Sequence, residues 1–328
     1  MQKMRILSGM RPSGKLHIGH LLGALSNWKK LQDEGHETHY MVADWHALTT
    51  EYENTQDVQS NILEMVYDWL AAGLDPNKSV IFVQSHVREH AELYLLFSMI
   101  TPLGWLERVP TYKEALEEYE GRDIATHGFL GYPLLQAADI LVYRAHAVPV
   151  GQDQVPHLEF ARELVRRFHH LYSEVFPEPQ ALLTETPYVR GIDGRKMSKR
   201  YGNAILLSDS EEETTEKVMK MLTDPARKRK SDPGNPDICP VFDLQKIFGT
   251  EEWVKRVDRE CRTAQIGCVE DKQALARFVN DSLRPFRTSR QRIAAEPERV
   301  KAILAEGAEK ARKAARATMA EVRKAMRI

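Results

Sequence analysis

The sequence has few cysteines, no long hydrophobic run and no excess of charge of either sign. Its 328 residues include three Cys, an odd number, so a disulfide framework is not expected. No segment approaches the roughly 20 apolar residues that cross a bilayer, and the N-terminus lacks the apolar core of a signal peptide. We therefore expect a cytoplasmic protein without a membrane partner. Because 46 Lys and Arg balance 47 Asp and Glu, a nucleic acid would have to bind a local basic patch.

The composition is that of a folded globular protein with two domains or one large one. Hydrophobic residues make up 42% of the chain and charged residues 28%, with 18 Gly and 16 Pro. These values exclude collagen-like, mucin-like and disordered chains. The chain is long enough to bury a sizeable core.

Strand and helix patterns alternate over the first half of the chain. Short apolar runs predict strands at residues 4–7, 40–43 and 80–83, and a last one at 148–150. Apolar residues at helical spacing predict helices at residues 21–31, 58–74, 90–100, 134–141 and 155–172. This alternation predicts an α/β fold in which helices cover a parallel sheet.

The character of the sequence changes past Pro177. A connector with Pro and Thr leads to a charged loop at 191–202, and charged helical patterns follow it. We place a domain boundary near residue 205, between a nucleotide-binding domain (1–205) and a helical domain (206–328). The basic tail 298–328 carries an apolar stripe and is expected to form a final helix that packs one face on the body.

Two histidines lie where the first predicted strand gives way to a helix, in His17-Ile18-Gly19-His20. A helix N-terminus offers free N–H groups and the positive end of a dipole, so anions bind there. His17 and His20 share one side of the first turn, and Gly19 lets a nucleotide approach the backbone. The alternative is two ordinary surface or core histidines.

A second polar segment, Lys196 to Arg200, lies in the charged loop. It places four hydrogen-bond donors, three of them cationic, within five residues. Taken alone, such a segment is typical of a solvated basic turn.

Taken together and in this order, the two segments resemble the HIGH and KMSKS motifs of class I aminoacyl-tRNA synthetases, with Arg200 in place of the usual final Ser. Further blocks along the whole chain resemble those of tryptophanyl-tRNA synthetases: residues 8–14, 44–46, 110–114, 132–140, 148–154 and 306–311. Tyrosyl-tRNA synthetases share the architecture and the equivalents of Gln136 and Asp139. They lack the opening Ser-Gly-Met-Arg-Pro-Ser-Gly and the block that ends in Gln-Asp-Gln.

The resemblance implies a Rossmann-type nucleotide-binding domain followed by an α-helical anticodon-binding domain. It also implies a tryptophan–tRNA ligase, which joins L-tryptophan to ATP, releases pyrophosphate and then charges tRNA(Trp). Mg²⁺ is expected to arrive with ATP. A homodimer is implied, and no DNA partner is expected. The basic run 227–230 and the basic tail are candidate contacts for tRNA phosphates, with a solvated turn as the alternative for the run.

Catalysis in such an enzyme comes from alignment and charge stabilisation, because the substrate carboxylate is already a nucleophile. The resemblance assigns the catalytic role to His17, His20, Lys113, Lys196, Ser198 and Lys199. It assigns ATP contacts to Arg11, Pro12, Ser13, His17, Gly19, His20, Gly151, Gln152, Asp153, Val189, Lys196, Met197, Ser198, Lys199 and Arg200.

An indole ring is flat and apolar with one donor, so its pocket needs apolar walls and one buried acceptor. Asp139, which precedes the apolar run 140–142, is the candidate acceptor, and the alternative is a carboxylate on a helix surface. The full set of candidate tryptophan contacts is Leu7, Gly9, His46, Tyr132, Gln136, Asp139, Ile140, Val148, Val150 and Gln154.

The three cysteines, Cys239, Cys261 and Cys268, all lie in the predicted helical domain. Their order resembles the pattern C-x22-C-x6-C-x2-C of tryptophanyl-tRNA synthetases that carry a 4Fe-4S cluster. Here the gaps are 21 and six residues, and Asp271 stands at the fourth position. A cluster with a carboxylate ligand, a tetrahedral zinc ion and three reduced thiols are the alternatives.

Three other functions compete with the tryptophan enzyme. A tyrosyl-tRNA synthetase shares the architecture. A small-molecule nucleotidylyltransferase shares the HxGH turn, but such enzymes are shorter and lack the second motif. A non-catalytic paralogue would serve as a binding module, although all of the expected catalytic positions are filled here.

Overall fold

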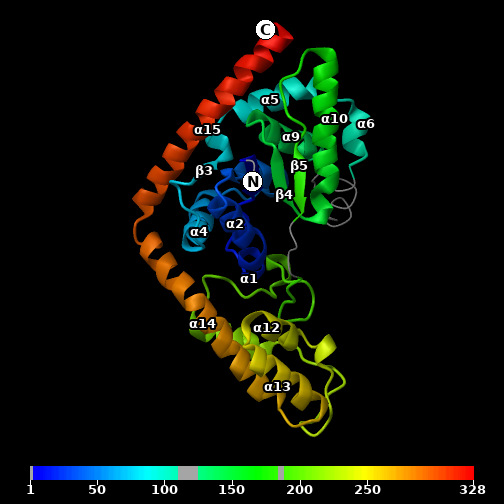
Figure 1. The fold of residues 1–328 in the computed structure, drawn as a ribbon, viewed down its shortest axis with the longest axis vertical. Coiled ribbons are helices and arrows are strands. Elements are labelled where there is room, and N and C mark those ends of the chain that lie inside the picture. Colours follow the sequence, from blue (N-terminus) through cyan, green and yellow to red (C-terminus); the bar gives the residue numbers. More distant parts are fainter. Residues whose placement is uncertain (1–2, 110–124, 184–187) are drawn as a thin grey trace.

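A five-stranded parallel sheet forms the centre of the computed structural model, which describes residues 3–109, 125–183 and 188–328 (Figure 1). The strand order is β3-β2-β1-β4-β5, and each neighbouring pair is parallel. The strands are β1 (Arg5–Met10), β2 (Glu37–Val42), β3 (Ser79–Val83), β4 (Ala147–Val150) and β5 (Gln180–Leu183).

The side chains of the inner strands alternate between two hydrophobic cores, as the twofold repeat of a strand requires. Leu7, Met41 and Phe82 belong to one core, which also contains residues of α5, α9, α10 and α15. Tyr40 and Val42 belong to the other core, which contains residues of α2, α4, α12 and α14. Both faces of the sheet are therefore covered, which explains why its strands read as continuous apolar runs.

Most of the described chain outside the sheet is helical. The helices that follow β1 to β4 are α1 (Ile18–His20), α2 (Ser26–Asp33), α3 (Asp44–Glu51), α4 (Val58–Ala71), α5 (Glu89–Ser98), α6 (Leu103–Glu107), α8 (His127–Leu130), α9 (Tyr132–Val142) and α10 (Val155–Leu171). The C-terminal helices are α11 (Glu211–Lys220), α12 (Pro240–Phe248), α13 (Glu251–Arg262), α14 (Cys268–Ala294) and α15 (Pro297–Met326). None of the helices in the described ranges is long and apolar enough to cross a membrane.

The predicted α/β fold with a parallel sheet and a helical C-terminal part is confirmed. The prediction that the last strand lies at 148–150 is wrong, because β5 follows it. This strand has only four residues and lies at the sheet edge. None of its side chains is buried, so buried and exposed positions do not alternate along it. It therefore lacks the periodic pattern from which strands are predicted.

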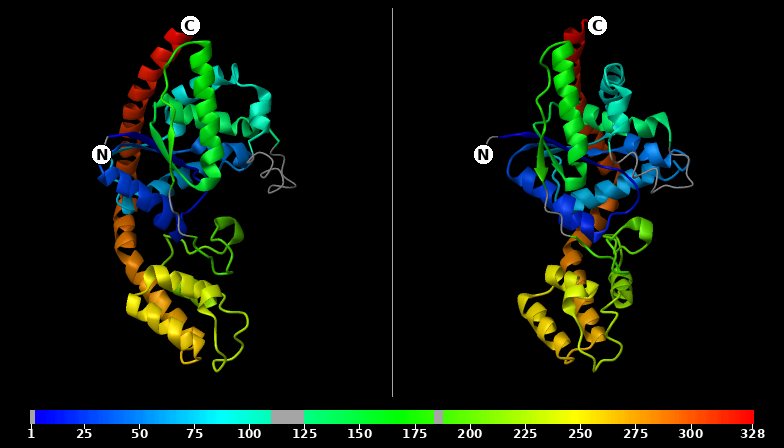
Figure 2. Two further views of the ribbon diagram at one scale, coloured as in Figure 1. Left: turned by 45° about the vertical axis from the view of Figure 1, so that its right-hand side comes forward. Right: turned by 90° about the vertical axis from the view of Figure 1, so that its right-hand side faces the viewer.

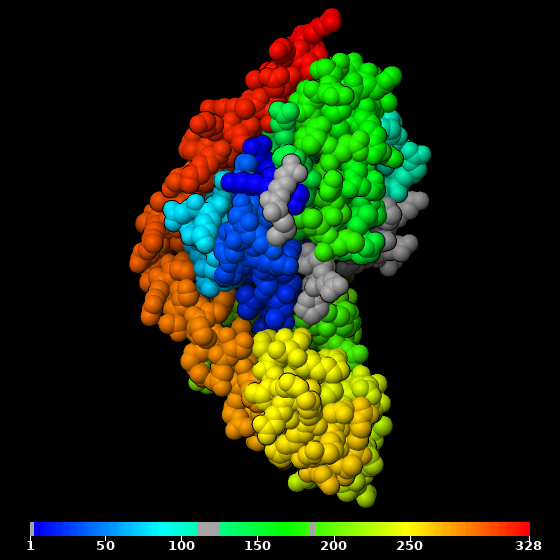
Figure 3. All heavy atoms as spheres, in the orientation of Figure 1, coloured from blue at the N-terminus to red at the C-terminus, as the bar shows by residue number. Residues whose placement is uncertain are grey.

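The last helix, α15, runs from the C-terminal helices along the sheet to the far end of the molecule (Figures 1 and 2). It packs on edge strand β3, and a Cβ added at Gly307 would lie 1.8 Å from the backbone oxygen of Ile81. The helix therefore shields this sheet edge, and Figure 3 shows it covering one side of the molecule. The buried face predicted for the tail includes Met319 and Val322. The domain division at residue 205 stays a prediction.

Candidate functional site

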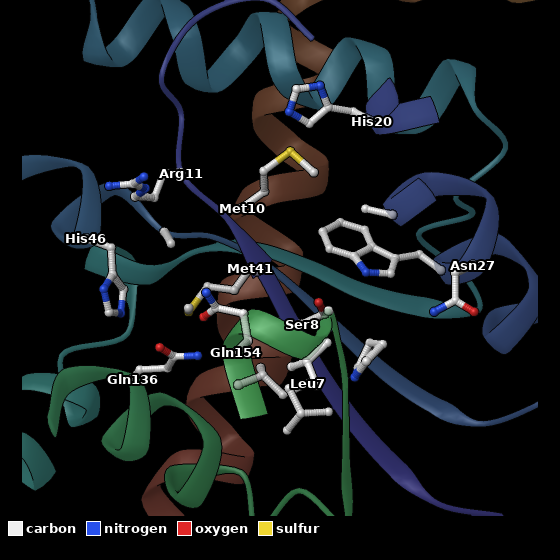
Figure 4. Close-up of a pocket in the computed structure, with 18 of the residues that line it drawn as sticks. Leu7, Ser8, Met10, Arg11, His20, Asn27, Met41, His46, Gln136 and Gln154 are labelled. Atoms are coloured by element: carbon white, nitrogen blue, oxygen red, sulfur yellow. The ribbon is translucent and has the colours of Figure 1, made fainter. Parts of the chain in front are cut away.

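One cavity of about 490 Å³ opens at the carboxyl ends of β1 and β4. The strand order reverses between these two strands, and open α/β sheets bind ligands at such a switch point. The cavity has two sides, which Figure 4 shows. His46 and Gln136 lie on one side, and His20 and Asn27 lie on the other.

The second side is built on the first turn of the helix that follows β1. His17 and His20 cap this turn for each other: His17 Nδ1 accepts from the backbone N–H of Gly19 at 3.1 Å, and His20 Nδ1 accepts from that of His17 at 3.2 Å. Burial, together with the nearby Lys199, lowers the pKa of His17 to about 4 and that of His20 to about 3. Both imidazoles are therefore neutral at pH 7, and because Nδ1 accepts, Nε2–H is the remaining donor of each ring.

The structure gives a local reason for a glycine at position 19, which the sequence did not reveal. A Cβ at this position would lie 2.9 Å from Cε1 of His17, so a side chain would displace the capping ring. A π-helical turn, Leu21–Leu25, follows directly. Such turns occur frequently at functional sites. Here the turn lies between His20 and the lining residue Asn27.

The loop 191–202 is held in shape by a buried amide. Asn203 is 1% exposed; its side-chain oxygen accepts from the backbone N–H of Ser198, and its side-chain nitrogen donates to the backbone oxygen of Lys196. Lys199 Nζ reaches across to the segment before the histidines, where it donates to Gly14 O at 3.1 Å and Ser13 Oγ at 3.3 Å. Burial, with the positive charge of Arg11, lowers the pKa of Lys199 to about 8.

The first side of the cavity contains a buried carboxylate. Asp139 on α9 is 2% exposed, so the alternative of a helix-surface carboxylate is wrong. Asp139 Oδ2 lies 2.7 Å from His46 Nε2, and Oδ1 lies 2.6 Å from His90 Nδ1. Gln84 Nε2 donates to both carboxylate oxygens. Gln136 Oε1, which also faces the cavity, is buried without a hydrogen-bond partner among the described residues.

All ten candidate tryptophan contacts line this cavity. The candidate ATP contacts divide into two groups. Those that line the cavity are Arg11, His17, Gly19, His20, Gly151, Val189, Lys196 and Met197. Those outside its lining are Pro12, Ser13, Gln152, Asp153, Ser198, Lys199 and Arg200. Lys113 lies outside the described residues. Which of these residues bind substrate stays a prediction.

Several residues that line the cavity were not predicted from the sequence. Ala24 and Asn27 follow His20 by four and seven residues, so the helical repeat alone would have placed them on the same face. Ser8 and Met10 lie on β1 beside the predicted Leu7 and Gly9. The contacts of Asp139 with His90 and Gln84 join positions 49 and 55 residues apart, and no local pattern reports them.

The three cysteines and Asp271 line a separate small cavity of about 20 Å³. Burial raises the pKa of the Cys239 and Cys261 thiols, and it raises that of Asp271 to about 6. Asp271 accepts a hydrogen bond from Gln245, 2.7 Å away. Within the described part of the chain, no group of three or more His, Cys, Asp and Glu side chains is arranged to hold a single metal ion.

The basic run 227–230 is partly used inside the protein. Arg227 donates to the backbone oxygens of Lys230 and Ile266 at 2.9 and 2.7 Å, whereas Lys228 and Arg229 are exposed. Basic residues of the tail also bind the body: Arg316 pairs with Glu89 and Arg323 with Glu92. The remaining tRNA candidates are therefore the exposed cations at 228–230 and those on the outer face of α15.

Comparison with known proteins gives consistent matches over the whole chain. The family model for tRNA synthetases class I (W and Y) matches residues 1–284. The tryptophan–tRNA ligase of Thermotoga maritima is 55% identical over 99% of each chain, and that of Aquifex aeolicus is 47% identical over 99% of this chain and 100% of the relative. A solved tryptophanyl-tRNA synthetase of Campylobacter jejuni, complexed with ADP and tryptophan, matches with a TM-score of 0.90 at 34% identity. This match covers 99% of the present chain and 100% of the solved one.

Proposed function

The chain belongs to the tRNA synthetases class I (W and Y), and from this membership we propose that it acts as a tryptophan–tRNA ligase. It activates L-tryptophan with ATP and then transfers the tryptophanyl group to tRNA(Trp). The observation that carries the proposal is a single cavity that joins a helix N-terminus with two neutral histidines to an apolar recess with a buried carboxylate. We also propose a cytoplasmic location, where ATP and tRNA are available.

Activation forms one bond and breaks another without a proton transfer. The tryptophan carboxylate attacks the α-phosphorus of ATP, and the bond from that phosphorus to the bridging oxygen breaks, so pyrophosphate leaves with the electron pair. The tRNA terminal hydroxyl then attacks the acyl carbon, the bond from that carbon to the phosphate oxygen breaks, and AMP leaves with the electron pair while its phosphate takes up the hydroxyl proton. Mg²⁺ is carried by the ATP phosphates, since Asp139 is the one carboxylate among the described lining residues and it lies beside His46, on the side of the cavity away from the histidine pair.

The neutral histidines suit this displacement. His17 and His20 are neutral at pH 7 and offer Nε2–H donors to phosphate oxygens, while their Nδ1 atoms stay hydrogen-bonded to the backbone of the turn. Lys196 at the cavity wall and Lys199 behind it supply the positive charge that balances the departing pyrophosphate.

An ATP–pyrophosphate exchange assay tests the function. We expect exchange that depends on tryptophan and that tyrosine supports at least about a hundredfold less well, as a site that must pair a buried polar group can discriminate. Exchange that tyrosine supports as well would identify a tyrosyl-tRNA synthetase. Exchange without any amino acid would identify a nucleotidylyltransferase, and no exchange at all a binding module.

The lowered pKa of Lys199 predicts a pH dependence. The value of kcat/KM for ATP reports ionisations of the free enzyme, and we expect it to fall as the pH rises through about 8, because Lys199 then loses its proton and its charge. Lys199→Arg carries a guanidinium that stays protonated, so its profile should remain flat to higher pH. The same falling limb in both proteins would assign it to another group.

We propose that the protein is a homodimer and that an apolar patch on α5 and α6 forms its interface. The patch consists of Leu95, Met99 and Leu103, which are 54%, 69% and 59% exposed. These three exposed apolar residues lie within nine positions of the chain, and exposed apolar patches mark association sites. One tRNA that spans both subunits would bind outside this patch, at the exposed cations.

Met99→Glu tests this interface. A charge buried in an apolar interface is costly, so we expect sedimentation analysis to find a dimer in the parent protein and a monomer in Met99→Glu. Leu222→Glu is the matched control, because Leu222 is 55% exposed but lies outside the patch. A parent protein that is monomeric at micromolar concentration contradicts the homodimer, and a dimeric Met99→Glu contradicts the interface.

We also propose that Cys239, Cys261, Cys268 and Asp271 hold an iron–sulfur cluster. Their shared cavity supports the donor set, and a four-iron cluster binds each ligand through a different iron, so its ligands lie farther apart than those of a single ion. Protein purified without oxygen should contain about four irons per chain and absorb broadly near 400 nm. Asp271→Cys should make the cluster more resistant to air. Zinc in place of iron, or neither metal, contradicts the cluster.

A further inference from the structure

A chain of buried polar groups extends from the cavity into the core behind Asp139. His90 and Tyr143 are both 0% exposed, and so is Gln84. Asp139 lies on α9, Tyr143 is the C-cap of that helix four residues further on, His90 lies on α5, and Gln84 lies just after β3. Burying four polar side chains in an otherwise apolar core costs free energy unless each polar group has a hydrogen-bond partner.

The hydrogen bonds of this chain are short and continuous. His90 Nδ1 lies 2.6 Å from Asp139 Oδ1, and His90 Nε2 lies 2.7 Å from the hydroxyl of Tyr143. A carboxylate only accepts, so His90 Nδ1 must carry the proton that faces Asp139. Burial alone would raise the pKa of Asp139, but the neighbouring His90 and the hydrogen bonds from His46 and His90 outweigh burial and lower it.

Three N–H donors reach Asp139, because a single N–H of Gln84 Nε2 is shared between the two carboxylate oxygens, so one acceptor position of Asp139 stays unused. A carboxylate offers about four lone-pair sites. Oδ1 accepts from His90 and Gln84 at 2.6 and 2.8 Å, whereas Oδ2 accepts from His46 at 2.7 Å and more distantly from Gln84 at 3.0 Å. Oδ1 is thus bound by donors on the core side of the carboxylate. Oδ2 is the oxygen that can accept a hydrogen bond from a further donor.

We infer that His90 and Tyr143 are positioning residues that fix Asp139 as an oriented, ionised acceptor for the ring N–H of the amino acid. This inference rests on the proposed function, in which that ring is an indole. Neither residue lines the cavity, so neither touches the substrate. His90 acts through Asp139 by donating to Oδ1, the oxygen that faces the core, and Tyr143 acts one step further away by holding the other ring nitrogen of His90.

The test compares tryptophan with β-(3-benzothienyl)alanine, in which sulfur replaces the ring N–H in a ring system of similar shape. The ratio of the two kcat/KM values in pyrophosphate exchange reports the hydrogen bond to Asp139, whereas a general loosening of the cavity affects both substrates. We expect His90→Leu to lower this ratio about tenfold, in line with the loss of a hydrogen bond that involves a charged group. His90→Asn, whose amide can replace Nδ1–H, should restore most of the ratio.

Tyr143→Phe removes only the outer hydroxyl and should lower the ratio less than His90→Leu. Phe97→Leu is the packing control: Phe97 is a fully buried residue of the same helix as His90, outside the polar chain, and its loss should lower Tm without changing the ratio. A ratio unchanged in His90→Leu overturns the inference for both residues. If His90→Leu does not fold, His90→Asn and Tyr143→Phe decide, and a parent-like ratio in Tyr143→Phe overturns it. Loss of tryptophan-dependent exchange in the parent protein would instead overturn the proposed function.

Discussion

Lys199→Ala is expected to lower the rate of adenylate formation by about 30- to 1000-fold and to leave tryptophan affinity nearly unchanged. In the proposed function this ammonium stabilises charge that moves onto pyrophosphate, and the loss of one preorganised donor of this kind costs about 2–4 kcal/mol in the transition state. Lys199 also holds Gly14 O and Ser13 Oγ, so its removal frees the segment that precedes the histidine pair. Single-turnover formation of the adenylate and equilibrium binding of tryptophan measure the two quantities.

Lys196→Ala should also lower the rate of adenylate formation, because Lys196 lines the cavity. Unlike the Lys199 side chain, that of Lys196 has no hydrogen bond to the segment before the histidines among the described residues. We therefore expect its effect on the rate to be smaller than that of Lys199→Ala. Lys30→Ala, at an exposed lysine on α2, is the control and should change neither quantity. A loss confined to tryptophan binding in Lys199→Ala contradicts the assigned role.

Elements with strong patterns could be predicted from the sequence. The expected strands at 40–43 and 80–83 correspond to β2 and β3, and the helix expected at 155–172 corresponds to α10 (Val155–Leu171). These segments are buried on one or both faces, so their apolar residues repeat regularly. Strand β5 shows the limit: its place in the sheet depends on pairing with β4, a contact that leaves no local pattern.

The site residues that could be predicted are likewise those that belong to a local sequence pattern. Residues that lie on strand ends or first helical turns, such as Gly9, His17 and Val150, were identified because each belongs to a local motif, and they line the cavity. The predicted Gln152 and Asp153 belong to the same block as Val150 and lie outside the lining, whereas Gln154, at the end of the same 3₁₀ turn, lines the cavity. Partners of Asp139 could not be predicted, because three other elements supply them and only the fold brings them together.

Asp139→Asn should have the largest effect on tryptophan itself. The amide replaces one carboxylate oxygen by a donor, so at least one of the donors from His46, His90 and Gln84 would face another donor. Each hydrogen bond to a charged group contributes about 1.5–3 kcal/mol, so loss of the charge and of one partner should weaken tryptophan binding by at least about a hundredfold.

Asp139→Asn also separates recognition from stability. We expect Tm to fall and discrimination against phenylalanine to relax, whereas the KM for ATP should change little, because the histidine pair lies on the other side of the cavity. Asp68→Asn is the matched control: Asp68 is 1% exposed and pairs with Arg290 at 2.6 Å, outside the cavity lining. It should lower Tm and keep tryptophan affinity. Unchanged tryptophan affinity and unchanged discrimination in Asp139→Asn would show that this carboxylate supports the core alone.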